Sequence, residues 1–171
     1  MLLEKIKALA AEGQAENISI RRHLHANPEL SYQEFETCKY VQAQLTKIGI
    51  PFTVIATTGV LGIIEGKNPT KRVIALRADM DALPILEENE VEYKSKNPGV
   101  MHACGHDVHT TILLGAAKIL WSVREEFEGT IKLLFQPGEE KNPGGASYMI
   151  RDGALQNPTP QVIIGLHVHP G

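Results

Sequence analysis

The sequence has no excess of positive charge. Its 17 lysines and arginines are outnumbered by 20 aspartates and glutamates, so the formal net charge is −3 with all 7 histidines neutral. Binding to nucleic acid needs a basic face that neutralises phosphates, so we expect no nucleic-acid partner. No uninterrupted apolar stretch approaches the roughly 20 residues of a membrane helix, and the N-terminal segment lacks the basic end and apolar core of a signal peptide. We therefore expect a cytoplasmic protein with no membrane partner.

Cysteine is scarce, and no segment is repeated or of low complexity. The two cysteines, Cys38 and Cys104, are too few for a disulfide scaffold, which leaves core packing, metal binding or thiol chemistry as their uses. Cys38 falls, with Phe35, on the apolar face of a predicted helix, and we expect it in the core. With 43% hydrophobic and 22% charged residues, the composition is typical of one globular domain.

Apolar spacing along the chain alternates between helical and extended periods. We expect helical segments at 2–10, 18–24, 107–123 and 146–151, and strands at 52–55, 59–65, 72–77, 130–135 and 161–166. A further helix over 35–48 is expected to begin at a capping box of Ser31 and Glu34 and to end at Gly49. Residues 87–99 are polar and should form a surface loop or hairpin. The alternation predicts an α/β layered domain with a mostly parallel or mixed sheet.

Three histidines and a cysteine stand close together immediately before a predicted helix, in the segment HACGHDVH at residues 102–109. Cys104 and His106 are two residues apart, so in extended backbone their side chains point to the same side and can bind neighbouring metal positions. Gly105 permits the tight backbone between them. The alternative is an ordinary loop in which Asp107 caps the helix.

Two adjacent carboxylates, Glu139 and Glu140, follow the strand at 130–135 beside a glycine-rich turn. Neighbouring side chains diverge in non-helical backbone, so one glutamate can bind a metal while the other faces the open coordination position. That division suits metal-assisted hydrolysis. A solvated pair of loop glutamates is the simpler alternative.

Two more strands end in polar residues. Asp79 and Asp81 lie just beyond the third predicted strand, and His167 and His169 follow the last one. Spacing alone does not separate the two histidines as metal ligands. Because ligand sites in open α/β sheets lie beyond the carboxyl ends of the strands, all of these clusters should meet in space.

Together, these segments resemble the M20 metallopeptidase family. More narrowly, they resemble its amidohydrolase branch, which includes hippurate hydrolase, N-acyl-L-amino-acid amidohydrolases and plant auxin-conjugate hydrolases. In chain order the matching segments read RRHLHANPELSYQE, RADMDALP, MHACGHDVHTT, FQPGEE and GLHVHP. The resemblance implies a zinc-peptidase-like, three-layer α/β/α catalytic domain with a mixed sheet and two divalent metal ions per complete site.

The resemblance also implies roles for individual residues. The expected metal ligands are Cys104, His106, Glu140 and His167. Glu139 is the expected general base, and either Asp79 or Asp81 is a catalytic residue that orients the site. Four further histidines belong to the matching segments without being expected ligands: His23, His25, His102 and His109. Thiolate, imidazole and carboxylate donors fit zinc, manganese, nickel or cobalt.

Members of this branch are much longer than 171 residues. They contain an inserted lid or dimerisation domain and then return to the catalytic domain, which supplies one more metal-binding histidine. We therefore expect residues 1–171 to be the N-terminal part of the catalytic domain, apparently truncated, and the full-length form to be a homodimer. The chain also departs from the family at Gly138, where alanine is more usual, and at His169, where tryptophan is.

The implied reaction is metal-dependent hydrolysis of the amide bond of N-acyl amino acids or related small amides. Glu139 would take the proton of the attacking water and return it to the departing amine. One alternative is a metal-binding fragment in which the catalytic residues are inherited but not assembled. Another is a thiol hydrolase with Cys104 as nucleophile, which predicts inactivation by alkylation and indifference to chelators.

Overall fold

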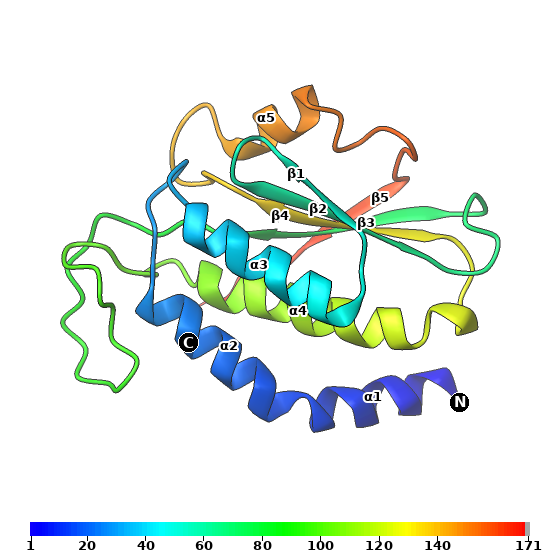
Figure 1. Cartoon of the computed structure of the whole chain (residues 1–171), viewed down its shortest axis with the longest axis horizontal. Coiled ribbons are helices and arrows are strands. Elements are labelled where there is room, and N and C mark those ends of the chain that lie inside the picture. Colours follow the sequence, from blue (N-terminus) through cyan, green and yellow to red (C-terminus); the bar gives the residue numbers. More distant parts are fainter. Residues whose placement is uncertain (170–171) are drawn as a thin grey trace.

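The computed structural model describes residues 1–169, and within them a five-stranded sheet has the order β1-β2-β4-β3-β5 (Figure 1). The strands span Phe52–Ile55 (β1), Gly59–Glu65 (β2), Val73–Asp79 (β3), Thr130–Gln136 (β4) and Val162–Gly165 (β5). β1, β2 and β4 pair antiparallel, whereas β4, β3 and β5 pair parallel. The sheet is therefore mixed, as the sequence predicts.

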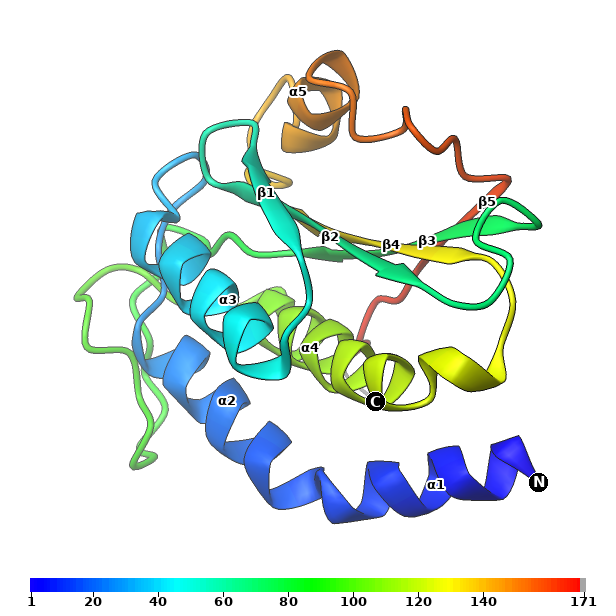
Figure 2. The ribbon, with the colours of Figure 1, turned by 45° about the vertical axis from the view of Figure 1, so that its right-hand side comes forward.

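Helices cover both faces of this sheet. They span Leu2–Glu12 (α1), Gln14–Ala26 (α2), Phe35–Ile48 (α3), His106–Ser122 (α4) and Gly145–Arg151 (α5), with a short 3-10 helix at Arg124–Glu126. α3 and α4 lie against one face with α1 and α2 outside them, and α5 lies on the opposite face, as Figure 2 shows. The layers confirm the expected α/β/α architecture.

The main core lies between the sheet and the helices α2, α3 and α4, and it includes Cys38 as predicted. β4 is buried at all seven positions because it has a strand on either side and a helical layer on each face. Its Leu133 and Phe135 enter the main core, whereas Leu134 enters a smaller cluster under α5. On the same face as Leu134, the buried Lys132 ammonium donates hydrogen bonds to the carbonyl oxygens of Gln156 (2.7 Å) and of Pro158 (3.0 Å), and burial lowers its pKa.

Parallel pairing brings the polar strand ends to one edge of the sheet. Asp79 pairs with Gln136 in the β3–β4 ladder, so these two strands end side by side. β5 runs parallel to β3 and ends at the same edge. α4 begins there too, since the Thr110 hydroxyl in its second turn donates to the Asp79 carbonyl at 2.7 Å. The predicted convergence therefore follows from the topology.

The start of α3 differs from the prediction. Glu34 stands at the N-cap position but makes no side-chain cap hydrogen bond, so the capping box of Ser31 and Glu34 is wrong. The Ser31 hydroxyl instead donates to Asp81 Oδ2 at 2.6 Å. The Glu34 carboxylate is fully buried and accepts from the Gly138 N–H and the Thr58 hydroxyl, each at 2.7 Å. Both side chains bind partners distant in sequence rather than the helix end.

The strands at 52–55 and 59–65 have the predicted bounds, and the other predicted elements are present with shifted bounds. Residues 87–99 contain no helix or strand, in line with the expected loop. Phe35 is 52% exposed instead of lying on the buried face of α3. None of the helices in residues 1–169 is long and apolar enough to cross a membrane.

β5 contrasts with β4. It is an edge strand, and all four of its residues are exposed. The apolar side chains of Val162, Ile163 and Ile164 are 47–51% exposed. The ladder with β3 is therefore the main contact that places β5.

Candidate metal centre

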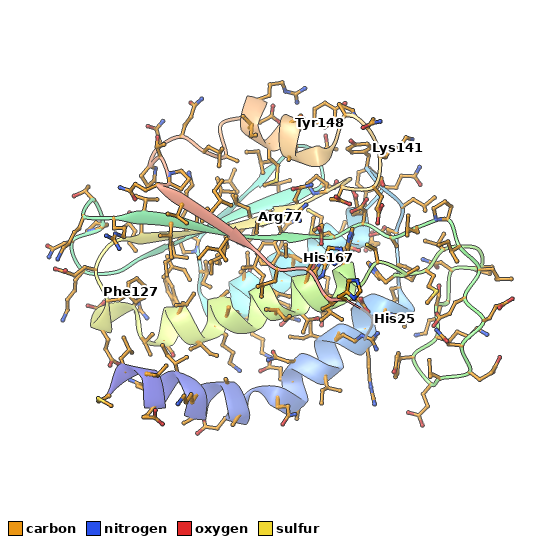
Figure 3. The ribbon with its side chains drawn as sticks, turned by 180° about the vertical axis from the view of Figure 1, so that it is seen from behind. His25, Arg77, Phe127, Lys141, Tyr148 and His167 are labelled. Atoms are coloured by element: carbon orange, nitrogen blue, oxygen red, sulfur yellow. The ribbon has the colours of Figure 1, made fainter. Side chains whose placement is uncertain are left out.

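The strand ends and the start of α4 converge on His106. Among residues 1–169, three groups of side chains each bring potential metal-ligand atoms within 4.8 Å of one another. These groups are Cys104, His106 and His167; Asp79, His106 and His109; and His106, Glu139 and Glu140. The other three predicted ligands thus gather around the His106 imidazole. Figure 3 shows His167 past the end of β5, beside the start of α4.

His106 is buried, and one of its ring nitrogens has no hydrogen-bond partner. Its Nδ1 lies 3.2 Å from Asp81 Oδ1. Its Nε2, the nitrogen without a partner, lies 3.7 Å from an Asp79 oxygen, 4.0 Å from a Glu139 oxygen and 3.8 Å from a Glu140 oxygen. A buried nitrogen facing three carboxylates fits a divalent cation, which would satisfy both the nitrogen and the negative charge.

The buried charges shift the pKa values of His106 and Asp81. Burial alone would lower the pKa of His106, but the hydrogen bond with Asp81 and the surrounding carboxylates outweigh burial and raise it. Burial opposes ionisation of Asp81, yet hydrogen bonds from His106, Ser31 and the Glu140 backbone lower its pKa to about 2. Asp81 is therefore a fixed anion that accepts the His106 Nδ1–H, which leaves Nε2 turned toward the cluster.

Cys104 and His167 meet on the more exposed side of the cluster, where Sγ lies 3.4 Å from Nε2. Burial, followed by the nearby carboxylates, raises the pKa of the Cys104 thiol to about 11. A thiol in that environment is protonated at neutral pH unless a cation takes the place of its proton, which tells against a Cys104 nucleophile. Of the two histidines that spacing did not separate, His167 is the one in the cluster. Pro170, at the end of the same segment, lies outside the described residues.

Asp79 is held differently from Asp81. Its Oδ2 lies 2.6 Å from the Arg77 guanidinium, and its Oδ1 lies 2.6 Å from His109 Nδ1. Asp81 therefore orients the His106 ring directly, whereas Asp79 acts mainly on His109. The sequence reasoning missed the parts played by Arg77 and His109. The position of His109 three residues after His106, on the same helical face, is the signal that indicates it.

Hydrogen bonds to two buried carboxylates hold the loop that carries Glu139 and Glu140. The Glu140 N–H donates to Asp81 Oδ2 at 3.0 Å, and the Gly138 N–H donates to the buried Glu34 carboxylate at 2.7 Å. Gly138 has φ 52°, and a Cβ there would lie 2.3 Å from the Tyr32 ring. The close ring explains why glycine suits this position. No sequence signal indicates the parts of Tyr32 and Glu34.

A second buried polar cluster links α4 to α2. His25 Nδ1 lies 2.7 Å from Asp107 Oδ2, and His25 Nε2 lies 3.0 Å from Glu87 Oε1. Arg21 lies 2.9 Å from the same Asp107 oxygen. The hydrogen bond with Asp107 raises the pKa of His25 despite burial, so the imidazolium pairs with both carboxylates. Asp107 therefore ties the two helices together and is not a helix cap.

The fold and the site define an α/β protein with thiol, imidazole and carboxylate groups gathered at the carboxyl ends of its strands. Residues 75–171 match peptidase family M20/M25/M40, and the chain belongs to this family. The family and the fold class that the sequence resemblance implied are thereby confirmed.

Several known proteins resemble the chain over nearly its whole length. The N-acyl-L-amino acid amidohydrolase of Geobacillus stearothermophilus is 48% identical over 169 residues, which are 98% of this chain and 45% of that protein. A putative aminohydrolase from methicillin-resistant Staphylococcus aureus superposes with a TM-score of 0.92 at 38% identity, covering 99% of this chain and 44% of that one. The Bacillus subtilis YXEP protein, described as a dinuclear metal-binding peptidase of the M20 family, gives a TM-score of 0.86 at 40% identity, covering 96% and 44%. The chain spans less than half the length of these relatives.

Proposed function

We propose that the chain is the N-terminal part of the catalytic domain of a metal-dependent amidohydrolase that cleaves N-acyl amino acids or related small amides. The observation that carries the proposal is the buried His106 Nε2, which has no hydrogen-bond partner and faces three carboxylates. The similarity to an N-acyl-L-amino acid amidohydrolase supports the substrate class. The homodimeric full-length form, the lid domain and the cytoplasmic location stay predictions.

Four side chains would hold two divalent ions: Cys104, His106, Glu140 and His167. Their mixed sulfur, nitrogen and oxygen donors fit zinc, manganese, nickel or cobalt. Ions bound there would polarise the amide carbonyl and lower the pKa of the attacking water.

The remaining side chains of the site move or orient protons. Glu139 takes the proton from the attacking water and returns it to the departing amine. Its carboxylate is suited to that task because its side chain is 43% exposed, against 23% for Glu140, so it reaches the open side of the cluster. Asp81 is ionised because its pKa is lowered, so it accepts a hydrogen bond from His106 Nδ1–H and keeps that proton on Nδ1.

Cobalt(II) binding by the purified chain tests the ligand set. A thiolate–cobalt absorption band should appear on titration, vanish in Cys104→Ser and weaken strongly in His106→Asn and Glu140→Gln. The exposed Glu90→Gln, in the 87–99 loop, is the control and should bind cobalt like the parent chain. A band that survives Cys104→Ser, or no binding at all, would contradict the proposed centre.

Hydrolysis of N-acetyl and N-benzoyl amino acids with manganese or zinc tests the reaction. The family resemblance implies one more histidine ligand from a later segment, so we expect little turnover by this chain alone. In a full-length enzyme, Glu139→Gln should keep the metal and lower the turnover by roughly 10²–10⁴-fold, whereas Glu140→Gln should release the metal. Activity that resists chelators and is abolished by alkylation would favour the thiol hydrolase instead.

A further inference from the structure

We infer that His109 is a positioning residue that holds the segment after β5, so that His167 stays beside Cys104 and His106. The inference rests on the proposed function, because it takes His167 to be a metal ligand. It assigns a task to a buried histidine that the proposed chemistry does not use.

His109 bridges the sheet and this segment through both ring nitrogens. The Val168 backbone N–H donates to His109 Nε2 at 2.9 Å. Since Nε2 accepts, Nδ1 must carry the ring hydrogen in the neutral imidazole, and it donates to Asp79 Oδ1 at 2.6 Å. The residue held by this bond directly follows His167.

The other end of the bridge is fixed inside the protein. Asp79 is 1% exposed and pairs with Arg77 at 2.6 Å. The same guanidinium donates through Nε to Gln136 Oε1 at 2.9 Å, which ties it to the end of β4. A chain of hydrogen bonds therefore runs from the central strands through Asp79 and His109 to the backbone at Val168.

The Val168 side chain makes a second contact, at Gly105 between Cys104 and His106. A Cβ on Gly105 would lie 2.3 Å from Val168 Cγ2, so the valine occupies space that only glycine leaves open. His167 itself is exposed, and its Nδ1 bonds only to the adjacent Val168 carbonyl, at 2.6 Å. Val168 is thus the point at which this exposed segment is docked onto α4.

The arrangement makes one helix responsible for two candidate ligands. His106 begins α4, and His109, one turn later on the same face, holds the neighbour of His167. Groups that orient metal ligands typically change metal affinity by 10–100-fold when removed. The same size of effect is expected here, although His109 binds the backbone beside the ligand and not the ligand ring.

The test compares the substitution of two buried histidines by leucine. His109→Leu should weaken cobalt binding by about 10–100-fold. His102→Leu is the matched control, because His102 is buried in the same segment without a hydrogen-bond partner, and it should leave the affinity unchanged. His109→Gln, whose amide oxygen reaches the place of Nε2, should restore much of the loss.

A measurement without metal separates docking from general damage. Amide hydrogen exchange at Val168 should accelerate by about 2–10-fold in His109→Leu, the range that one hydrogen bond supplies, and not in His102→Leu. Unchanged exchange at Val168, or equal loss of cobalt affinity in the two leucine variants, would overturn the inference.

A double variant separates this inference from the proposed function. In a His167→Ala background, His109→Leu should cause no further loss of cobalt affinity, since the ligand it positions is gone. Additive losses would overturn the positioning role while leaving the ligand set intact. A His167→Ala chain that binds cobalt as tightly as the parent would instead contradict the ligand assignment, and the inference with it.

Discussion

Two segments of the candidate metal centre are held in different ways: the loop with Glu139 and Glu140, and the segment with His167. The glutamate loop follows the fully buried β4 and is braced from inside by Asp81, Glu34 and Tyr32. The Tyr32 hydroxyl donates to the Lys141 carbonyl at 2.6 Å and accepts from the Gly144 N–H at 3.1 Å. The histidine end, which is the segment with His167, follows the exposed β5. It is held by one hydrogen bond and one close packing contact at Val168 and by the contact of His167 with Cys104.

The difference indicates that substitutions in the two segments should have different effects on stability and on metal binding. Removing a brace under the glutamate loop leaves buried polar groups without partners, so it should cost both stability and metal binding. Removing the contacts of Val168 with His109 and Gly105 frees an exposed segment, so it should weaken metal binding with little loss of stability. Four substitutions test this difference.

Glu34→Ala should have the largest effect on stability, because three donors lose their buried acceptor. The Gly138 and Tyr32 N–H groups and the Thr58 hydroxyl all bond to this carboxylate. We expect a loss of about 3–5 kcal/mol in the free energy of unfolding, measured by urea denaturation. Glu34→Gln keeps an acceptor oxygen and should lose less. Exposed Glu36→Ala is the control, and an equal loss there would refute the buried brace.

His25→Gln tests the first turn of α4, on which both ends depend. The raised pKa of His25 means that the pairing with Asp107 and Glu87 stabilises the fold below the ordinary histidine pKa near 6.5. That stability is lost as the pH rises through the raised value. At pH 6 we expect His25→Gln to lose about 1.5–3 kcal/mol, with the gap to the parent chain closing at high pH. A gap that widens with pH would show that His25 is neutral.

Gly105→Ala should disturb the histidine end with a modest stability loss. Gly105 has φ 80°, so alanine costs about 1–2 kcal/mol in backbone strain, and its Cβ meets Val168 Cγ2. Gly99→Ala is the matched control, because Gly99 has φ 78° and no atom within 4 Å of a Cβ. Both should lose similar stability, but only Gly105→Ala should weaken cobalt binding, by about 10–100-fold. Equal cobalt affinities would show that the Val168 contact does not place His167.

Ile163→Thr should have the smallest effect. Ile163 lies on β5 with 48% exposure, so the change in unfolding free energy should stay within about 0.5 kcal/mol. The same substitution at the fully buried Ile64 of β2 should cost about 1–3 kcal/mol, since a hydroxyl enters the core. Comparable losses at the two positions in thermal or urea unfolding would mean that β5 is packed as firmly as the central strands.

Much of the fold, and the meeting of the candidate ligands at the strand ends, were predictable from local signals. Alternating apolar residues and glycine or proline turns mark the strands, and the rule that ligands bind beyond strand ends places the clusters together. The capping box failed because Ser31 and Glu34 have the residue types of a helix start but bind Asp81 and Gly138, which lie far along the chain. Local spacing carries no information about such partners.

The sequence likewise could not predict which of Asp79 and Asp81 contacts which histidine. Asp79 and Asp81 are two residues apart at one strand end, and only the register of β3 and the position of α4 decide which meets His106 and which meets His109. The docking of Val168 on His109 joins residues 59 positions apart. Contacts of that kind depend on tertiary structure and not on residue pattern.

The most direct test of the centre is anomalous diffraction from crystals of this chain grown with zinc. We expect zinc peaks within about 2.0–2.3 Å of Cys104 Sγ, His106 Nε2, a Glu140 oxygen and a His167 nitrogen. Peaks absent from this cluster, or found instead among His25, Glu87 and Asp107, would contradict the proposed metal centre.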